Sequence, residues 1–179
     1  MNYHDDMFGQ FAEAFLGNME GDGDIPVRDK LTTSKLDYSL ESLQEVDRYL
    51  EIVYKIKISD SSKEYQNLVV WAGAYIGEVI RRNADEEYHW VQYNEYMENK
   101  DASLKNLVPL LLTTHAFLVA VESDYMTMPI NKVARRLDEG SSNNIHFYAA
   151  GDISRKSGNR NPGDRNLSNS KTKPWWKIW

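Results

Sequence analysis

The sequence predicts an α+β fold, in which helices pack on one side of a small antiparallel sheet. Apolar residues recur with helical spacing along four segments, and two later segments are rich in β-branched and aromatic residues. With 179 residues, of which 41% are hydrophobic and 27% charged, the chain can form one domain with a buried core. We assign residues 1–150 to this domain. Residues 151–179 form a flexible basic linker with a tryptophan-rich tip, expected to be disordered because large apolar residues are rare before residue 173.

The first helix is expected over residues 5–19 of an amphipathic N-terminal segment, 1–20. Phe8, Phe11 and Phe15 fall on one helical stripe, and the glycines at 21 and 23 should end the helix. The stripe favours packing on the domain, and a detachable arm that docks on another subunit is the alternative.

Two longer helices are expected next, over residues 40–55 and 63–82. Ser39 is the expected N-cap of the earlier one, and the polar run at 59–62 separates the two. The helix at 63–82 carries the strongest apolar pattern, which places it at the centre of the core.

Strands are expected over residues 88–93, 107–112 and 115–121. Pro109 makes the middle one an edge strand or a bulge. Both faces of 115–121 are apolar, which fits a covered strand, and the pattern also allows a buried helix there.

The domain should close with two short helices. One begins at Met128-Pro129 and ends at Gly140. The other is capped by Ser141 or Ser142 and reaches Ala149 or Ala150, where Gly151 ends it.

Gly73 and Gly77 lie four residues apart in the central helix. Each costs about 1 kcal/mol relative to alanine inside a helix, so a close contact should compensate. Packing of another element against this surface is the favoured interpretation, and a ligand on the bare backbone is the alternative.

Glu78 is an acidic residue in an otherwise apolar stretch, four residues before Arg82. An exposed ion pair between them would contribute about 0.2–0.5 kcal/mol. The alternative is a hydrolase in which buried Glu78 works with His89 or an arginine such as Arg82, while Arg81 and Arg82 bind an anionic substrate.

No metal or cofactor is expected. The chain has no cysteine, its four histidines show no metal-ligand spacing, and nucleotide-binding glycine loops are absent.

The charge is unevenly distributed. The chain carries a net charge of −6, with seven basic and two acidic residues in 151–179, so residues 1–150 carry −11. An acidic body disfavours nucleic acid as a partner and favours a basic protein. The tip, with Trp175, Trp176 and Trp179, is expected to fold back, bind a protein or touch a membrane surface weakly.

The chain also resembles a family of small uncharacterised bacterial domains. The resemblance spans roughly residues 36–150 and rests on the leucine-rich segment 36–50, Gly-Ala-Tyr-Ile-Gly-Glu at 73–78, Trp90, and the proline-led helix with Val-Ala-Arg-Arg-Leu at 133–137. It implies a compact α+β domain with no assigned activity. Similar small acidic domains include immunity proteins that sequester toxins.

These observations predict a non-enzymatic protein-binding protein of the bacterial cytoplasm, immunity-like in its action. A signal peptide and a transmembrane segment are not expected. The alternatives are the hydrolase and membrane association through the tail. The oligomeric state stays open, and the candidate binding residues are Glu78, Arg82, His89, Trp90, Trp175, Trp176 and Trp179.

Overall fold

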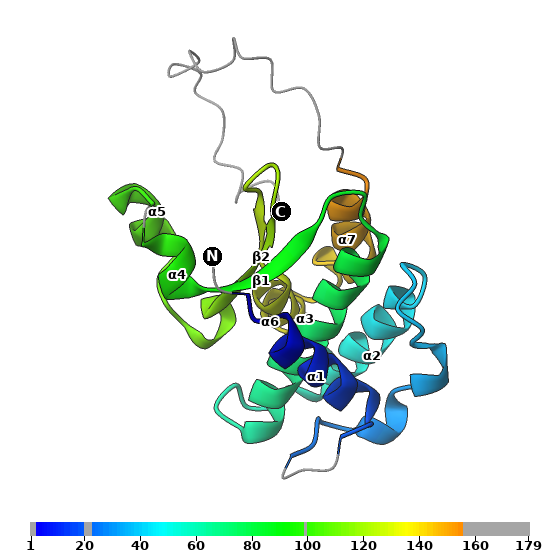
Figure 1. Ribbon diagram of the computed structural model, residues 1–179. Helices are drawn as coiled ribbons and strands as arrows, with labels where there is room; N and C mark the ends of the chain where they lie inside the picture. Colours follow the sequence, from blue (N-terminus) through cyan, green and yellow to red (C-terminus); the bar gives the residue numbers. More distant parts are fainter. Residues whose placement is uncertain (1–2, 20–22, 99, 156–179) are drawn as a thin grey trace.

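The computed structural model describes residues 3–19, 23–98 and 100–155 (Figure 1). Its helices are α1 (Asp5–Leu16), α2 (Leu43–Ile56), α3 (Lys63–Asn83), α4 (Tyr93–Met97), α5 (Ala102–Leu107), α6 (Pro129–Glu139) and α7 (Ile145–Ile153). Its strands are β1 (Tyr88–Gln92), β2 (Ala116–Ala120) and β3 (Met126–Thr127). The predicted fold class is confirmed, since the helices pack on a three-stranded antiparallel sheet. None of the described helices is long and apolar enough to cross a bilayer.

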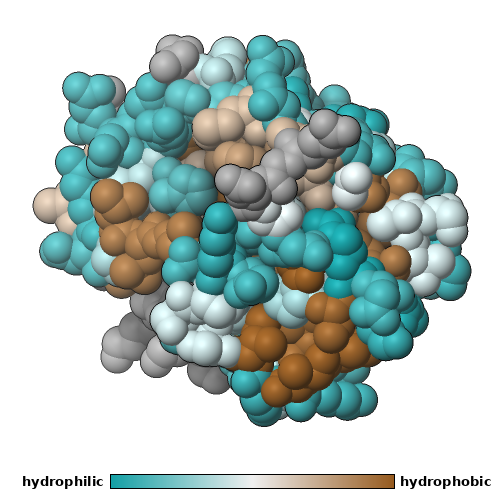
Figure 2. Space-filling model, turned by 90° about the horizontal axis from the view of Figure 1, so that it is seen from below, coloured by the Kyte–Doolittle hydropathy of each residue, from teal (hydrophilic) through white to brown (hydrophobic). Residues whose placement is uncertain are grey.

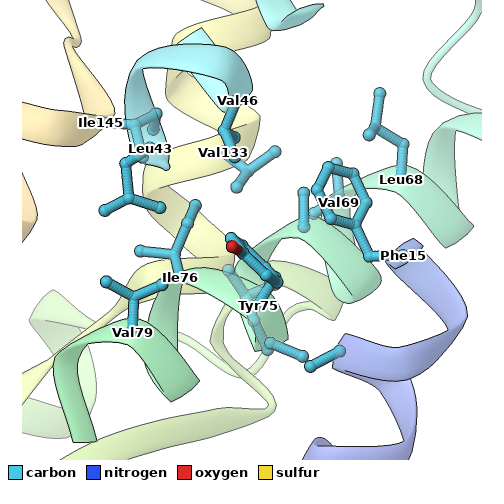
Figure 3. Packing of buried hydrophobic residues seen from close by; sticks show 14 of the residues in the cluster. Phe15, Leu43, Val46, Leu68, Val69, Tyr75, Ile76, Val79, Val133 and Ile145 are labelled. Carbon is cyan, nitrogen blue, oxygen red and sulfur yellow. The ribbon is translucent and has the colours of Figure 1, made fainter. Parts of the chain in front are cut away.

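Helix α3 lies at the centre of the core, as its apolar pattern predicts. It packs against α1, α6 and α7. Figure 3 shows side chains from these helices and from α2 converging on α3 around Tyr75 and Ile76, both of which are fully buried. Phe15 brings α1 into this cluster, so the first helix packs on the domain, as the favoured interpretation predicted.

The sheet separates two hydrophobic cores. Its strand order is β1-β2-β3, with Trp90 opposite Leu118 in an antiparallel register. Trp90 and Leu118 belong to the main core, whereas Phe117 and Val119 belong to a second, smaller core. Every residue of β2 is buried, so the prediction of a strand covered on both faces is confirmed.

The two glycines of α3 are sites of close packing. A Cβ atom on Gly73 would lie 2.6 Å from the Cα of Ile130 in α6. A Cβ on Gly77 would overlap the indole ring of Trp90. Both glycines therefore allow another element to approach the helix backbone, as predicted, and the space that a ligand would need is filled.

The segment predicted as an edge strand, residues 107–112, is not a strand. Its first residue ends α5, whose N-cap Asp101 accepts a hydrogen bond from the backbone N–H of Ser103. The rest is an irregular loop that leads into a 3₁₀ turn at Leu112–Thr114. Thr114 Oγ1 accepts a bond from the N–H of Leu111 and donates to Pro109 O, so local bonds replace a strand ladder.

Several predicted helix ends were wrong because nearer caps take their place. Gly17, at φ 83°, ends α1 before the glycines at 21 and 23. Helix α2 begins at Leu43, after a turn in which the N–H of Ser42 donates to Ser39. Asn144 caps α7 by accepting from the N–H of Phe147, and α7 continues through Gly151.

Candidate functional site

Asp5 joins the first helix to the sheet. One carboxylate oxygen accepts from the backbone N–H of Trp90 at 2.8 Å. The other lies 2.5 Å from Nδ1 of His89 and 3.0 Å from Arg81. Nε2 of His89 lies 2.9 Å from the carboxylate of Glu87, so both ring nitrogens face carboxylates.

Glu78 pairs with Arg81 more closely than with the predicted Arg82. Its carboxylate lies 2.8 Å from Arg81, against 3.8 Å from Arg82. The Arg82 guanidinium lies 3.5 Å from the centre of the Tyr38 ring, so it packs on this ring as well as facing Glu78. The predicted ion pair exists, but Glu78 is buried while Arg82 is exposed.

The structure links Glu78 to His89 through Arg81 and Asp5. Glu78 lines a shallow groove beside α1, together with Asp5, Asp6 and Glu13, and His89 is not part of its wall. A general base must present a ring nitrogen or carboxylate to substrate. In this structure these atoms bind one another, so the network stabilises the junction of α1, α3 and β1.

Trp90 is a core residue. Its ring stacks on Phe8 at 4.1 Å, it is fully buried, and its Nε1 has no hydrogen-bond partner in the described part of the chain. It therefore packs helix against sheet, and it is not placed to contact a partner.

Replacing Asp5 with alanine tests whether the network is structural. We expect the free energy of unfolding to fall by about 2–3 kcal/mol, because a half-buried carboxylate bound to a backbone N–H, to the His89 ring and to the Arg81 guanidinium is lost. Urea denaturation measures this. In a double-mutant cycle with Arg81→Ala, the two losses should be less than additive. Fully additive losses would show that the pair carries no coupling.

A second candidate site was missed in the sequence. It is a pocket of about 300 Å³ between β3, α6, α7 and the segment after α5. Its walls are largely apolar, from Leu107, Val108, Pro109, Leu111, Met126 and Met128. Its polar lining comes from Thr114, Tyr125, Thr127, Asn131, Lys132, Arg135, Tyr148 and Asp152.

Asp152 anchors the polar floor of this pocket. Its carboxylate accepts from Thr127 Oγ1 at 2.6 Å and from the hydroxyl of Tyr125 at 3.0 Å. Tyr148 forms a hydrogen bond with Thr127. Burial raises the pKa of Asp152 despite these bonds, and burial also raises the pKa of Tyr148 well above its usual value. Lys132 donates to Asn143 at 3.1 Å, and burial lowers its pKa.

The raised pKa of Asp152 predicts a pH effect of defined sign. The folded state favours the protonated carboxyl, so this contribution to stability is present below the unfolded pKa of about 3.9 and is lost as the pH rises through the folded pKa. We expect the free energy of unfolding of Asp152→Asn, relative to that of wild type, to be larger at pH 7 than at pH 4, because only wild type has to bury an ionised carboxylate at pH 7. Urea titrations at both pH values measure this, and a larger relative stability at pH 4 would contradict it.

A sequence signal for the pocket exists in retrospect. Tyr148 and Asp152 lie four residues apart on one face of an otherwise apolar helix, and a buried aspartate there needs hydroxyl partners. Those partners come from β3, a two-residue strand with no periodic pattern.

Within the described residues, no group of three or more histidine, aspartate or glutamate side chains is arranged to hold a metal ion. The prediction of no metal stays a prediction, which elemental analysis of the untagged protein tests. The predicted tail residues Trp175, Trp176 and Trp179 lie outside the described residues.

Comparisons of this chain with protein-family models, with curated proteins and with solved structures found no match. The family resemblance over residues 36–150 therefore stays a prediction.

Proposed function

We propose that the chain is a non-enzymatic protein-binding protein of the bacterial cytoplasm, which holds a bulky apolar side chain of a partner in the pocket beside residues 107–112. The observation that carries this proposal is an exposed leucine segment at the pocket. Leu107, Leu110, Leu111 and Leu112 are each 45–56% exposed. Contiguous exposed apolar side chains beside a pocket are typical of interaction sites.

The pocket suits an aromatic side chain with one polar atom. Its volume is at the lower end of the range of small-molecule sites, so it fits a side chain better than a large cofactor. Apolar walls would hold the ring, and the carboxylate of Asp152 offers an acceptor at the floor.

Charge supports a basic partner. Residues 1–150 carry −11, which attracts a basic protein from a distance. Seen from below, the surface is largely hydrophilic, and its hydrophobic residues gather in separate patches (Figure 2). Sequestering a basic protein would resemble the action of immunity proteins. The analogy concerns the way of acting and implies no common ancestry.

The hydrolase alternative has less support. Glu78 and His89 do not line the same groove. Their charged and polar atoms bind Arg81 and Asp5 of the same chain, so neither side chain is presented to a substrate. No observation in the described residues favours membrane association, because its predicted residues lie in 156–179.

A site-specific crosslinking experiment tests the proposal. A photo-crosslinking amino acid replaces Leu110 in the full chain, expressed in the native host, and crosslinked proteins are identified by mass spectrometry. The same amino acid in place of Ile56, 48% exposed at the end of α2, is the control.

The purified partner is then titrated against wild type, Leu111→Lys and Ile56→Lys. We expect Leu111→Lys to weaken binding at least about tenfold, and Ile56→Lys to have little effect. Equal affinities, or crosslinks that are the same from positions 110 and 56, would overturn the proposal.

A further inference from the structure

The described chain ends at the wall of the pocket. Arg155, the last described residue, places its guanidinium 3.4 Å from the ring of Tyr125. Tyr125 and Asp152 both line the pocket. Residue 156 therefore directly follows a residue that contacts the pocket lining.

We propose that the pocket is occupied by an indole of the chain's own C-terminal tip, residues 173–179, when no partner is bound. This goes beyond the proposed function, because the tip can dock whether or not an external partner exists. If a partner uses the same pocket, the tip competes with it.

The length of the segment favours this occupant. Residues 156–172 are rich in serine, asparagine, glycine and charged residues, a composition typical of a flexible linker. For such a linker the end-to-end distance is roughly 5–6 Å times the square root of the residue number, about 20–25 Å here. The tip is therefore held near the pocket at an effective concentration of about 1 mM, at which a weak contact suffices.

The chemistry of the tip also matches the pocket. It carries Trp175, Trp176 and Trp179 within five residues. The N–H of a buried indole usually finds an acceptor, and the pocket combines apolar walls with the carboxylate of Asp152.

Charge adds to the attraction between the tip and the domain. Residues 151–179 carry +5, while residues 1–150 carry −11. The same charges oppose docking of the domain on an anionic membrane surface, because the acidic body would be repelled.

The experiment uses the pure full-length chain, labelled with 5-fluorotryptophan and observed by ¹⁹F NMR. Five resonances are expected, since the chain has five tryptophans, and single Trp→Phe variants assign them. A soluble paramagnetic chelate then reports the solvent exposure of each indole. Leu111→Lys at the pocket mouth is compared with Ile56→Lys, which introduces the same side chain at a position of similar exposure, 48% against 56%.

We expect one tail resonance to be broadened about twofold less than a free indole, because a contact near the effective concentration is occupied about half the time. Leu111→Lys should abolish this protection, and Ile56→Lys should leave it unchanged. Equal protection in both variants, or none in wild type, would overturn the proposal.

Two further outcomes would show that the tip binds somewhere other than the pocket of its own chain, and either would overturn the proposal. Protection that disappears on dilution would place the tip on a second copy of the chain. Protection that appears only with phosphatidylglycerol–phosphatidylcholine vesicles would place it on a membrane. Since no partner is present in this experiment, its failure is distinguishable from failure of the proposed function.

Discussion

Replacing Gly77 with alanine is expected to lower the free energy of unfolding by about 3 kcal/mol, although alanine is the better helix former. The added methyl group would overlap the indole ring of Trp90. That ring cannot move aside easily, because it stacks on Phe8 at 4.1 Å and both are fully buried. Gly73→Ala should also destabilise, since its Cβ would lie 2.6 Å from the backbone of Ile130.

Two other helical glycines provide controls of opposite sign. A Cβ on Gly9 in α1 or on Gly151 in α7 would meet nothing within 4 Å. Alanine at either position should stabilise the protein by up to about 1 kcal/mol, from helix propensity alone. Urea midpoints measure all four variants. Similar shifts for Gly77→Ala and Gly9→Ala would show that the packing against Trp90 carries no energy.

The second large effect is expected for Asp47→Ala, a loss of about 3 kcal/mol. Asp47 lies in α2, and its carboxylate accepts from the backbone N–H groups of Ile145 and His146, each at 2.9 Å. It thereby caps α7 from another helix, a contact that contributes about 1–2 kcal/mol. The same carboxylate lies 3.6 Å from the buried guanidinium of Arg136. In the Asp47→Ala variant, Arg136 would keep only Glu51 as a carboxylate partner in the described part of the chain.

Asparagine separates the two roles of Asp47. Asp47→Asn keeps one oxygen that can accept at the helix end and loses the charge facing Arg136, so its loss should be intermediate. Glu122→Ala, at an exposed position, should change stability by less than about 0.5 kcal/mol. If Asp47→Ala behaves like Glu122→Ala in thermal or urea denaturation, α7 does not depend on this cap.

The parts of the fold that could be predicted are those encoded by local pattern. The apolar period located α3 within one residue, and the β-forming run located β1 within one residue. Proline at the first position located the start of α6. Each of these patterns lies within one short segment of sequence. The elements could therefore be predicted without knowing which distant residues they contact.

The candidate site could not be predicted in the same way, because long-range contacts build it. The pocket joins residues from four segments between 107 and 152, and Thr127 meets Asp152 only after the chain has folded. The segment at 107–112 has the composition of a strand. It finds no ladder partner, because Thr114 binds its backbone locally. The predicted pair of Glu78 with Arg82 exists, but Arg81 lies closer to Glu78, and the Arg82 guanidinium also packs on the ring of Tyr38, 44 positions earlier.

The second core gives the molecule a weak point at the pocket mouth. It consists of six buried residues, and Val108 is its only buried contribution from residues 107–112. Helices α4 and α5 on this side project away from the helices around α3 (Figure 1). Amide hydrogen exchange in α4 and α5 should therefore proceed through a partial opening that costs less than global unfolding. The leucine segment can then be remodelled by an incoming side chain while α3 and its amide protection remain intact.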